Sequence, residues 1–65
     1  MARDNELKYL VGMTEEMALV TLSDTDAVFR VVRRGDVYYP VTRDWRPERI
    51  NIEFENNKVS RAYYA

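Results

Sequence analysis

Hydrophobic and polar residues alternate most regularly in the last third of the chain. In residues 49–55 three apolar side chains alternate with polar ones, namely Ile50, Ile52 and Phe54. This pattern is typical of a strand that buries one face. Residues 58–64 follow the pair Asn56-Asn57, and asparagine tolerates the positive φ of a tight turn. They are expected to form the last strand, with Val59, Arg61 and Tyr63 on one face and Ser60, Ala62 and Tyr64 on the other. The pattern therefore predicts a hairpin of strands 49–55 and 58–64.

A third strand is predicted over residues 27–33. β-branched side chains, which favour strands, are frequent in this stretch. Side chains that alternate between the two faces of a strand would place Ala27, Phe29 and Val31 on one face and Val28, Arg30 and Val32 on the other. Gly35-Asp36 suits a tight turn directly after this strand, and residues 37–39 are expected to continue extended.

A short helix is predicted over residues 15–22. Thr14 is a favourable N-cap, and the next two residues are glutamates, which the positive end of the helix dipole stabilises. A stripe of small and apolar residues follows: Met17, Ala18, Val20, Thr21 and Leu22. Because two turns are marginally stable alone, the helix is expected to pack on the sheet. Residues 1–6 are polar and expected to be a flexible terminus.

These elements predict one small α+β domain over residues 1–65, with the short helix packed on a small mixed sheet. The chain is 65 residues long, near the lower limit for folding without disulfides or metals. It contains no Cys and no His, which excludes disulfides and the usual zinc, thiol and imidazole chemistry. We therefore expect neither an enzyme nor a cofactor or metal site.

No apolar run approaches the roughly 20 residues of a membrane span, and the charged start of the chain has no apolar signal segment. We expect no membrane partner. The chain as written indicates a cytoplasmic protein, with secretion left open. A monomer, or a weak dimer formed through the last strand as a sheet edge, is expected.

Charge is unevenly distributed although the net charge is only −1. Residues 1–29 hold two basic and six acidic groups, a net of −4, whereas residues 30–49 hold six arginines and three acidic groups, a net of +3. A local basic segment on a mildly acidic body favours recognition of one acidic or polar site over broad binding to a polyanion.

Residues 40–48 are expected to form an exposed, extended loop. Pro40 and Pro47 lack amide donors, fix φ and favour extended geometry in the residue before them. Between them lie arginine, aspartate and tryptophan, and binding residues concentrate on loops held by rigid scaffolds. Each residue also has a structural interpretation: the arginines as a solvated cluster, Trp45 as a cover for the core, and Asp44 as a turn residue.

The sequence from Pro40 to Ile52 resembles the reactive-site loop and following strand of the potato inhibitor I family of serine protease inhibitors, and more closely the small inhibitors of the I78 type. The resemblance rests on a threonine, a variable residue, an acidic residue, an aromatic, an arginine, two further residues and another arginine, here Thr42, Arg43, Asp44, Trp45, Arg46, Pro47-Glu48 and Arg49. Leu10-Val-Gly-Met-Thr14 is similar to the family's approach to its helix.

The resemblance implies a substrate-like loop that binds a trypsin-like or subtilisin-like protease and is cut slowly. The protease-binding residues would be Pro40, Val41, Thr42, Arg43, Asp44, Trp45 and Arg46. The reactive bond would be Arg43–Asp44, with Arg43 as the primary specificity residue.

The resemblance also implies that Thr42 and Asp44 are braced from the strand beneath. Arg49 matches the first bracing arginine, and Asn51 stands where the plant inhibitors have a second. The alternative function is a protein-interaction module that uses the same loop, or a nucleic-acid-binding module. We do not expect nucleic acid as a partner, because the chain is acidic overall and has few lysines.

Overall fold

The computed structural model describes residues 2–65, and their side chains from Glu6 onward. It has a small α+β fold with a four-stranded mixed sheet in the order β2-β1-β3-β4. The elements along the chain are the 3₁₀ helix η1 (Ala2–Leu10), the helix α1 (Glu15–Asp24) and the strands β1 (Phe29–Arg34), β2 (Val37–Tyr38), β3 (Ile50–Glu55) and β4 (Lys58–Tyr64). The predicted fold class is confirmed.

The hairpin of β3 and β4 has the predicted strands and turn. The two strands pair antiparallel from Glu55↔Lys58 to Ile50↔Tyr64. Both turn residues have positive φ, 53° at Asn56 and 66° at Asn57, which is the backbone that a two-residue hairpin turn requires.

The helix α1 begins where predicted and ends two residues later than predicted. The Met17 amide donates to the Thr14 hydroxyl, which confirms the N-cap. Of the predicted stripe, Ala18 and Leu22 are fully buried, whereas Met17 and Val20 are more than half exposed. The prediction for Met17 and Val20 was wrong because this helix contacts the rest of the fold along one narrow line of positions four residues apart.

The 3₁₀ helix η1 was not predicted; its range covers most of the segment expected to be a flexible terminus. Only Met1 lies outside the described residues. Leu7 and Leu10 are buried in the core with Ala18 and Leu22 of α1 and the apolar residues of β3. Side chains three residues apart share one face of a 3₁₀ helix. The sequence interpretation missed it because two leucines three residues apart are too short a pattern.

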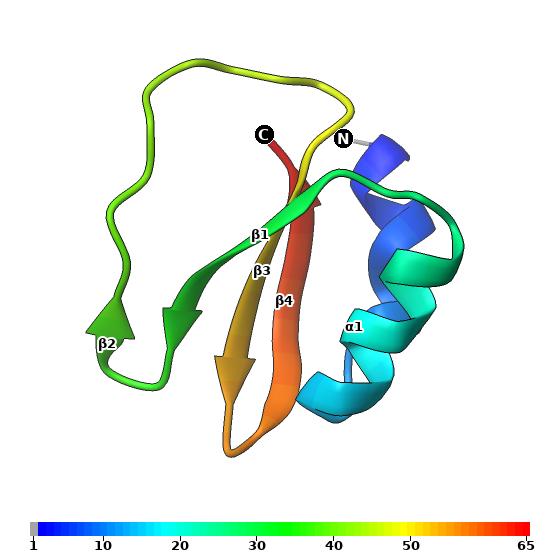
Figure 1. Cartoon of the computed structure of the whole chain (residues 1–65), viewed down its shortest axis with the longest axis vertical. Coiled ribbons are helices and arrows are strands. Elements are labelled where there is room, and N and C mark those ends of the chain that lie inside the picture. The colour runs from blue at the N-terminus through cyan, green and yellow to red at the C-terminus, as the bar shows by residue number, and fades with distance from the viewer. Residues whose placement is uncertain (1) are drawn as a thin grey trace.

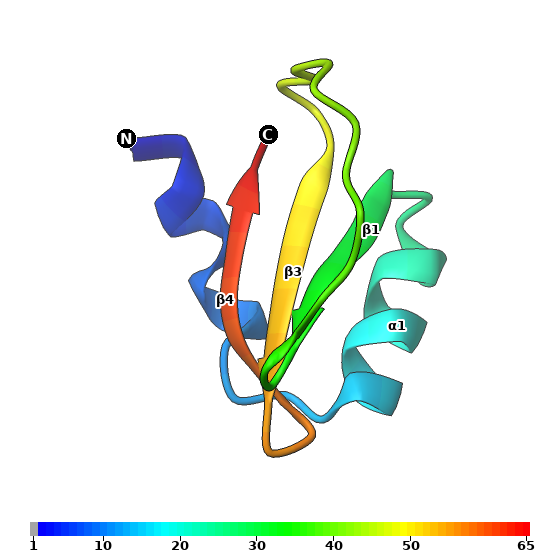
Figure 2. The ribbon, with the colours of Figure 1, turned by 90° about the vertical axis from the view of Figure 1, so that its left-hand side faces the viewer.

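The long loop follows from the topology of the sheet. Strands β1 and β3 are parallel neighbours, so the chain must return from the end of β1 to the start of β3, and such a crossover needs a dozen or more residues. Residues 35–49 make this connection, with β2 as its first part. In Figure 1 the loop arcs from β2 to β3 on the side of the sheet away from α1, and Figure 2 shows it above the starts of β1 and β3.

At the beginning of β4, backbone groups on its outer edge are hydrogen-bonded to residues 12 and 13 of the same chain. The Gly12 amide donates to the Val59 carbonyl over 2.9 Å, and the Val59 amide donates to the Met13 carbonyl over 2.8 Å. Farther along, η1 runs beside β4 (Figure 2). The edge expected to support a weak dimer is therefore partly paired within the chain. Among residues 2–65, no helix has both the length and the apolar character needed to cross a membrane.

Candidate functional site

The loop predicted to bind a partner is exposed along its whole length. Every residue from Pro40 to Glu48 is exposed. The side chain of Trp45, the only tryptophan of the chain, is 73% exposed. Trp45 therefore does not cover the core, and this structural interpretation is wrong. An exposed loop without contacts to the rest of the fold keeps its conformational entropy and samples many conformations. The contacts beneath the loop therefore decide whether it has one defined conformation.

Arg49 connects the loop to the sheet from below. It lies just before β3, and the residue is only 8% exposed. Its Nη2 donates to the Asp44 carbonyl oxygen over 2.7 Å, and its Nη1 lies 3.5 Å from Asp44 Oδ2. Its Nε donates to the Ala65 carbonyl oxygen over 2.9 Å. One buried guanidinium thus joins the middle of the loop to the end of β4, in the place expected for a bracing arginine.

Thr42 is contacted by an arginine that the sequence interpretation did not identify. Arg30 of β1 donates from Nη1 to the Thr42 hydroxyl over 3.2 Å and from Nε to Asn51 Oδ1 over 3.0 Å. Asn51, which is 4% exposed, stands where the plant inhibitors have a second bracing arginine. Here it accepts a hydrogen bond from Arg30, which contacts the loop. Arg30 and Asn51 are direct neighbours across the parallel pair β1–β3. No sequence pattern showed that these two strands pair in this register.

Asp44 is held by several positive or hydrogen-donating groups. A hydrogen bond from the Thr42 side chain, a second from Arg46 and the charge of Arg49 lower the pKa of Asp44 to about 2. The Arg46 bond is 3.0 Å from Nε to Oδ2. A carboxylate that accepts several such bonds is stabilised in its charged form. Asp44 is therefore more than a turn residue.

Arg43 differs from its neighbouring arginines. Arg46 and Arg49 both pair with Asp44, whereas Arg43 is exposed. Within the part of the chain whose side chains are described, the Arg43 side chain has no hydrogen bond or ion pair. The loop thus presents one uncompensated guanidinium, flanked by Thr42 and Asp44, which are both held from the sheet.

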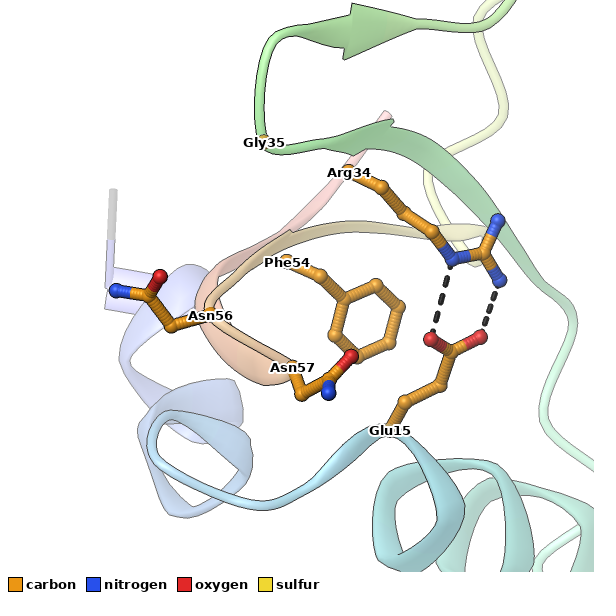
Figure 3. A pocket seen from close by; sticks show the side chains of 6 residues that line it. All are labelled: Glu15, Arg34, Gly35, Phe54, Asn56 and Asn57. Atoms are coloured by element: carbon orange, nitrogen blue, oxygen red, sulfur yellow. Dashed lines mark hydrogen bonds and ion pairs between the residues drawn. The ribbon is translucent and has the colours of Figure 1, made fainter.

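Two cavities lie outside the exposed face of the loop. One, of about 200 Å³, lies under the start of the loop and is lined mainly by aromatic and apolar side chains, including Val32, Tyr38 and Tyr63. The other, of about 280 Å³, lies at the far end of β1 and β3 from the loop apex. Figure 3 shows Glu15 paired with Arg34 in this second cavity, beside Phe54. Because Glu15 neutralises the Arg34 charge, this cavity is not an anion site. The ion pair connects α1 to β1.

The loop and its supports come together for a simple geometric reason. The starts of β1 and β3 and the end of β4 lie at the same end of the sheet (Figure 2). The loop passes above these strand ends, which carry its supports Arg30, Arg49, Asn51 and Ala65.

Comparison with protein-family models, curated proteins and solved structures gave no match to this chain. Any functional conclusion therefore rests on this geometry and on the residues of the loop.

Proposed function

We propose that this chain inhibits serine proteases by presenting residues 40–46 as a substrate-like loop, with Arg43–Asp44 as the reactive bond. The observation that carries the proposal is the contrast between Arg43 and Arg49. Arg43 is exposed and has no ion pair with any side chain from Glu6 onward, while the buried Arg49 holds the next residue, Asp44, by its carbonyl and carboxylate. The residues quoted for the resemblance to the potato inhibitor I family support the same proposal.

The proposed mechanism depends on the order of the loop before it binds. An extended segment enters a protease cleft as a substrate does and pairs by main-chain hydrogen bonds. Because the contacts to Thr42 and Asp44 already restrict the loop, little conformational entropy is lost on binding, and the affinity is high. The same contacts hold both sides of the bond in place, so the loop is a poor substrate.

A trypsin-like protease is the target class that fits Arg43 best. A guanidinium pairs strongly and with defined geometry with a carboxylate at the floor of a pocket, as in trypsin. Subtilisin-like proteases are the second class implied by the resemblance. Val41 and Trp45, exposed on either side of the bond, would then lie against neighbouring apolar surfaces of the enzyme.

Nucleic-acid binding is less well supported. A single-strand binding groove needs several free cationic side chains along its path. In the loop, Arg46 and Arg49 are paired with Asp44, and Arg30 beneath it contacts Asn51 and Thr42. Arg43 and an exposed Trp45 are too small a surface for this function.

Replacing Arg43 tests the proposal. Arg43→Ala is expected to weaken inhibition of trypsin by at least about 100-fold, because a buried charge-assisted pair with the pocket is lost. The unfolding midpoint should be unchanged, since Arg43 is exposed. The matched control is Arg61→Ala, which removes an exposed arginine of β4 whose recorded contacts are with Glu53 and Tyr63 of the sheet. Inhibition constants and thermal unfolding curves would be measured for both variants. Equal inhibition by Arg43→Ala and the wild type would disprove the assigned role of Arg43.

A further inference from the structure

We propose that Arg30 is a positioning residue for the acyl side of the reactive bond, whereas Arg49 positions the leaving side. This inference rests on the proposed function. It assigns to β1 a role in the loop that the resemblance does not include. It also explains how a chain with Asn51 in place of a second strand arginine holds both sides of its reactive bond.

The orientation of Arg30 is set by Asn51. The side-chain oxygen Oδ1 of the buried Asn51 accepts a hydrogen bond from Arg30 Nε–H over 3.0 Å. The donors of a guanidinium point in fixed directions in one plane. With Nε held in this way, Nη1 is directed at the Thr42 hydroxyl, 3.2 Å away. Asn51 thus acts on the loop through Arg30, not by its own contact.

A bulge in β1 places Arg33 on the same face of the sheet as Arg30. The register between β1 and β3 shifts between Val31 and Arg33, so that Arg30 faces Asn51 and Arg33 faces Glu53. In a regular strand, residues three apart point to opposite faces. Because of the extra residue, both arginines lie on one face, but Arg33 is paired with Glu53 and Glu55 and contacts no residue of the loop apex.

The two positioning arginines hold the two products of cleavage. When a serine protease attacks, its hydroxyl oxygen adds to the Arg43 carbonyl carbon. The bond to the Asp44 nitrogen then breaks, the nitrogen takes a proton from the enzyme, and an ester to Arg43 remains. The reverse step returns that proton and re-forms the peptide bond. If Thr42 and Asp44 stay held, the new amine stays beside the ester, and re-formation competes with attack by water.

The acyl side and the leaving side therefore depend on different arginines. Loss of Arg30 frees the acyl side at Thr42, and loss of Arg49 frees the leaving side at Asp44. Either loss lets the two ends separate after cleavage. A residue that only stabilises the fold, such as Arg33, would change the unfolding temperature without changing the ratio of cleaved to intact loop.

The test compares Arg30→Ala, Arg30→Lys and Arg33→Ala with the wild type. Each protein is incubated with a catalytic amount of trypsin until the ratio of cleaved to intact Arg43–Asp44 bond is constant, as measured by mass spectrometry. Arg30→Ala is expected to shift this ratio about tenfold toward the cleaved form, the effect of losing one charge-assisted hydrogen bond at an exposed site. Arg30→Lys should lie between, because an ammonium does not have the guanidinium's fixed fork. Arg33→Ala should match the wild type.

A second readout is independent of inhibition. Trp45 is the only tryptophan and sits on the loop, so its time-resolved fluorescence anisotropy reports loop motion without any protease. Arg30→Ala should increase the amplitude of fast motion, and Arg33→Ala should not. If the loop loosens in Arg30→Ala but the wild type does not inhibit any serine protease, the positioning role holds and the proposed function fails. If the wild type inhibits and Arg30→Ala matches it in both readouts, the positioning role is disproved.

Discussion

At the scale of single residues, the arginines of the loop differ in whether their guanidinium groups form hydrogen bonds within the protein. The Arg49 guanidinium contacts Asp44 and Ala65, whereas that of Arg43 has no hydrogen bond or ion pair with any described side chain. The support of Asp44 by Arg49 was expected from the resemblance of the loop to the potato inhibitor I family. The sequence could not predict that Arg30 contacts Thr42, since that contact depends on a neighbouring strand whose pairing no local pattern encodes.

The pKa of Asp44 gives a prediction about acid. Its folded-state pKa of about 2 is below its ordinary value of 3.8. The stabilisation of the loop by ionised Asp44 is therefore complete above about pH 4 and is lost as the pH falls through about 2. A carboxyl-carbon NMR titration should give a midpoint near 2 for Asp44, and Trp45 anisotropy should show the loop loosening over the same range.

The neighbours of Asp44 provide the control for this titration. Arg46→Ala removes a hydrogen bond to the carboxylate and should raise the midpoint toward the ordinary value. Arg61→Ala, which does not contact Asp44, should leave it unchanged. A wild-type midpoint near 3.8 would contradict the described surroundings of Asp44.

At the scale of elements, the strands and α1 were predictable, whereas η1 was not. In β3 the apolar residues Ile50, Ile52 and Phe54 alternate and are buried, and the Asn56-Asn57 turn has a specific backbone requirement that the sequence meets. In β4 the predicted faces were wrong: the register with β3 shifts between Glu53 and Phe54, and Val59, Ala62 and Tyr64 all pack on the core. In β1 the bulge interrupts the alternation, so the faces assigned from the sequence do not hold beyond Val31. Among the described side chains of the helix η1, those of Leu7 and Leu10 lie in the core, and two residues are too few for a periodic pattern to appear.

The burial of Leu7 and Leu10 predicts that η1 contributes to stability. Leu10 is fully buried, so Leu10→Ala is expected to lower the free energy of unfolding by about 2–5 kcal/mol. Val11→Ala, at a half-exposed neighbouring position, should cost much less. Chemical denaturation of both variants would measure this difference. Equal, small effects would show that η1 does not belong to the core and that the segment behaves as the flexible terminus expected from the sequence.

At the scale of the whole molecule, one end of the sheet supports the loop and the other end joins α1 through the Glu15–Arg34 ion pair. Two parallel strands and the end of the antiparallel strand β4 bring Arg30, Arg49, Asn51 and Ala65 beneath the loop. The far end holds the second cavity, which is lined by the Glu15–Arg34 pair and the β3–β4 turn (Figure 3). The sequence predicted the exposed loop from its two prolines, but only the parallel pairing explains why the loop is long and where its supports lie.

The most direct measurement is a titration of trypsin, and separately of subtilisin, with the purified protein. Residual activity and cutting at Arg43–Asp44 would be followed together in the same samples. The account predicts stoichiometric loss of trypsin activity with slow cleavage at this one bond. Rapid cleavage at Arg43–Asp44, with both enzymes remaining fully active, would contradict it.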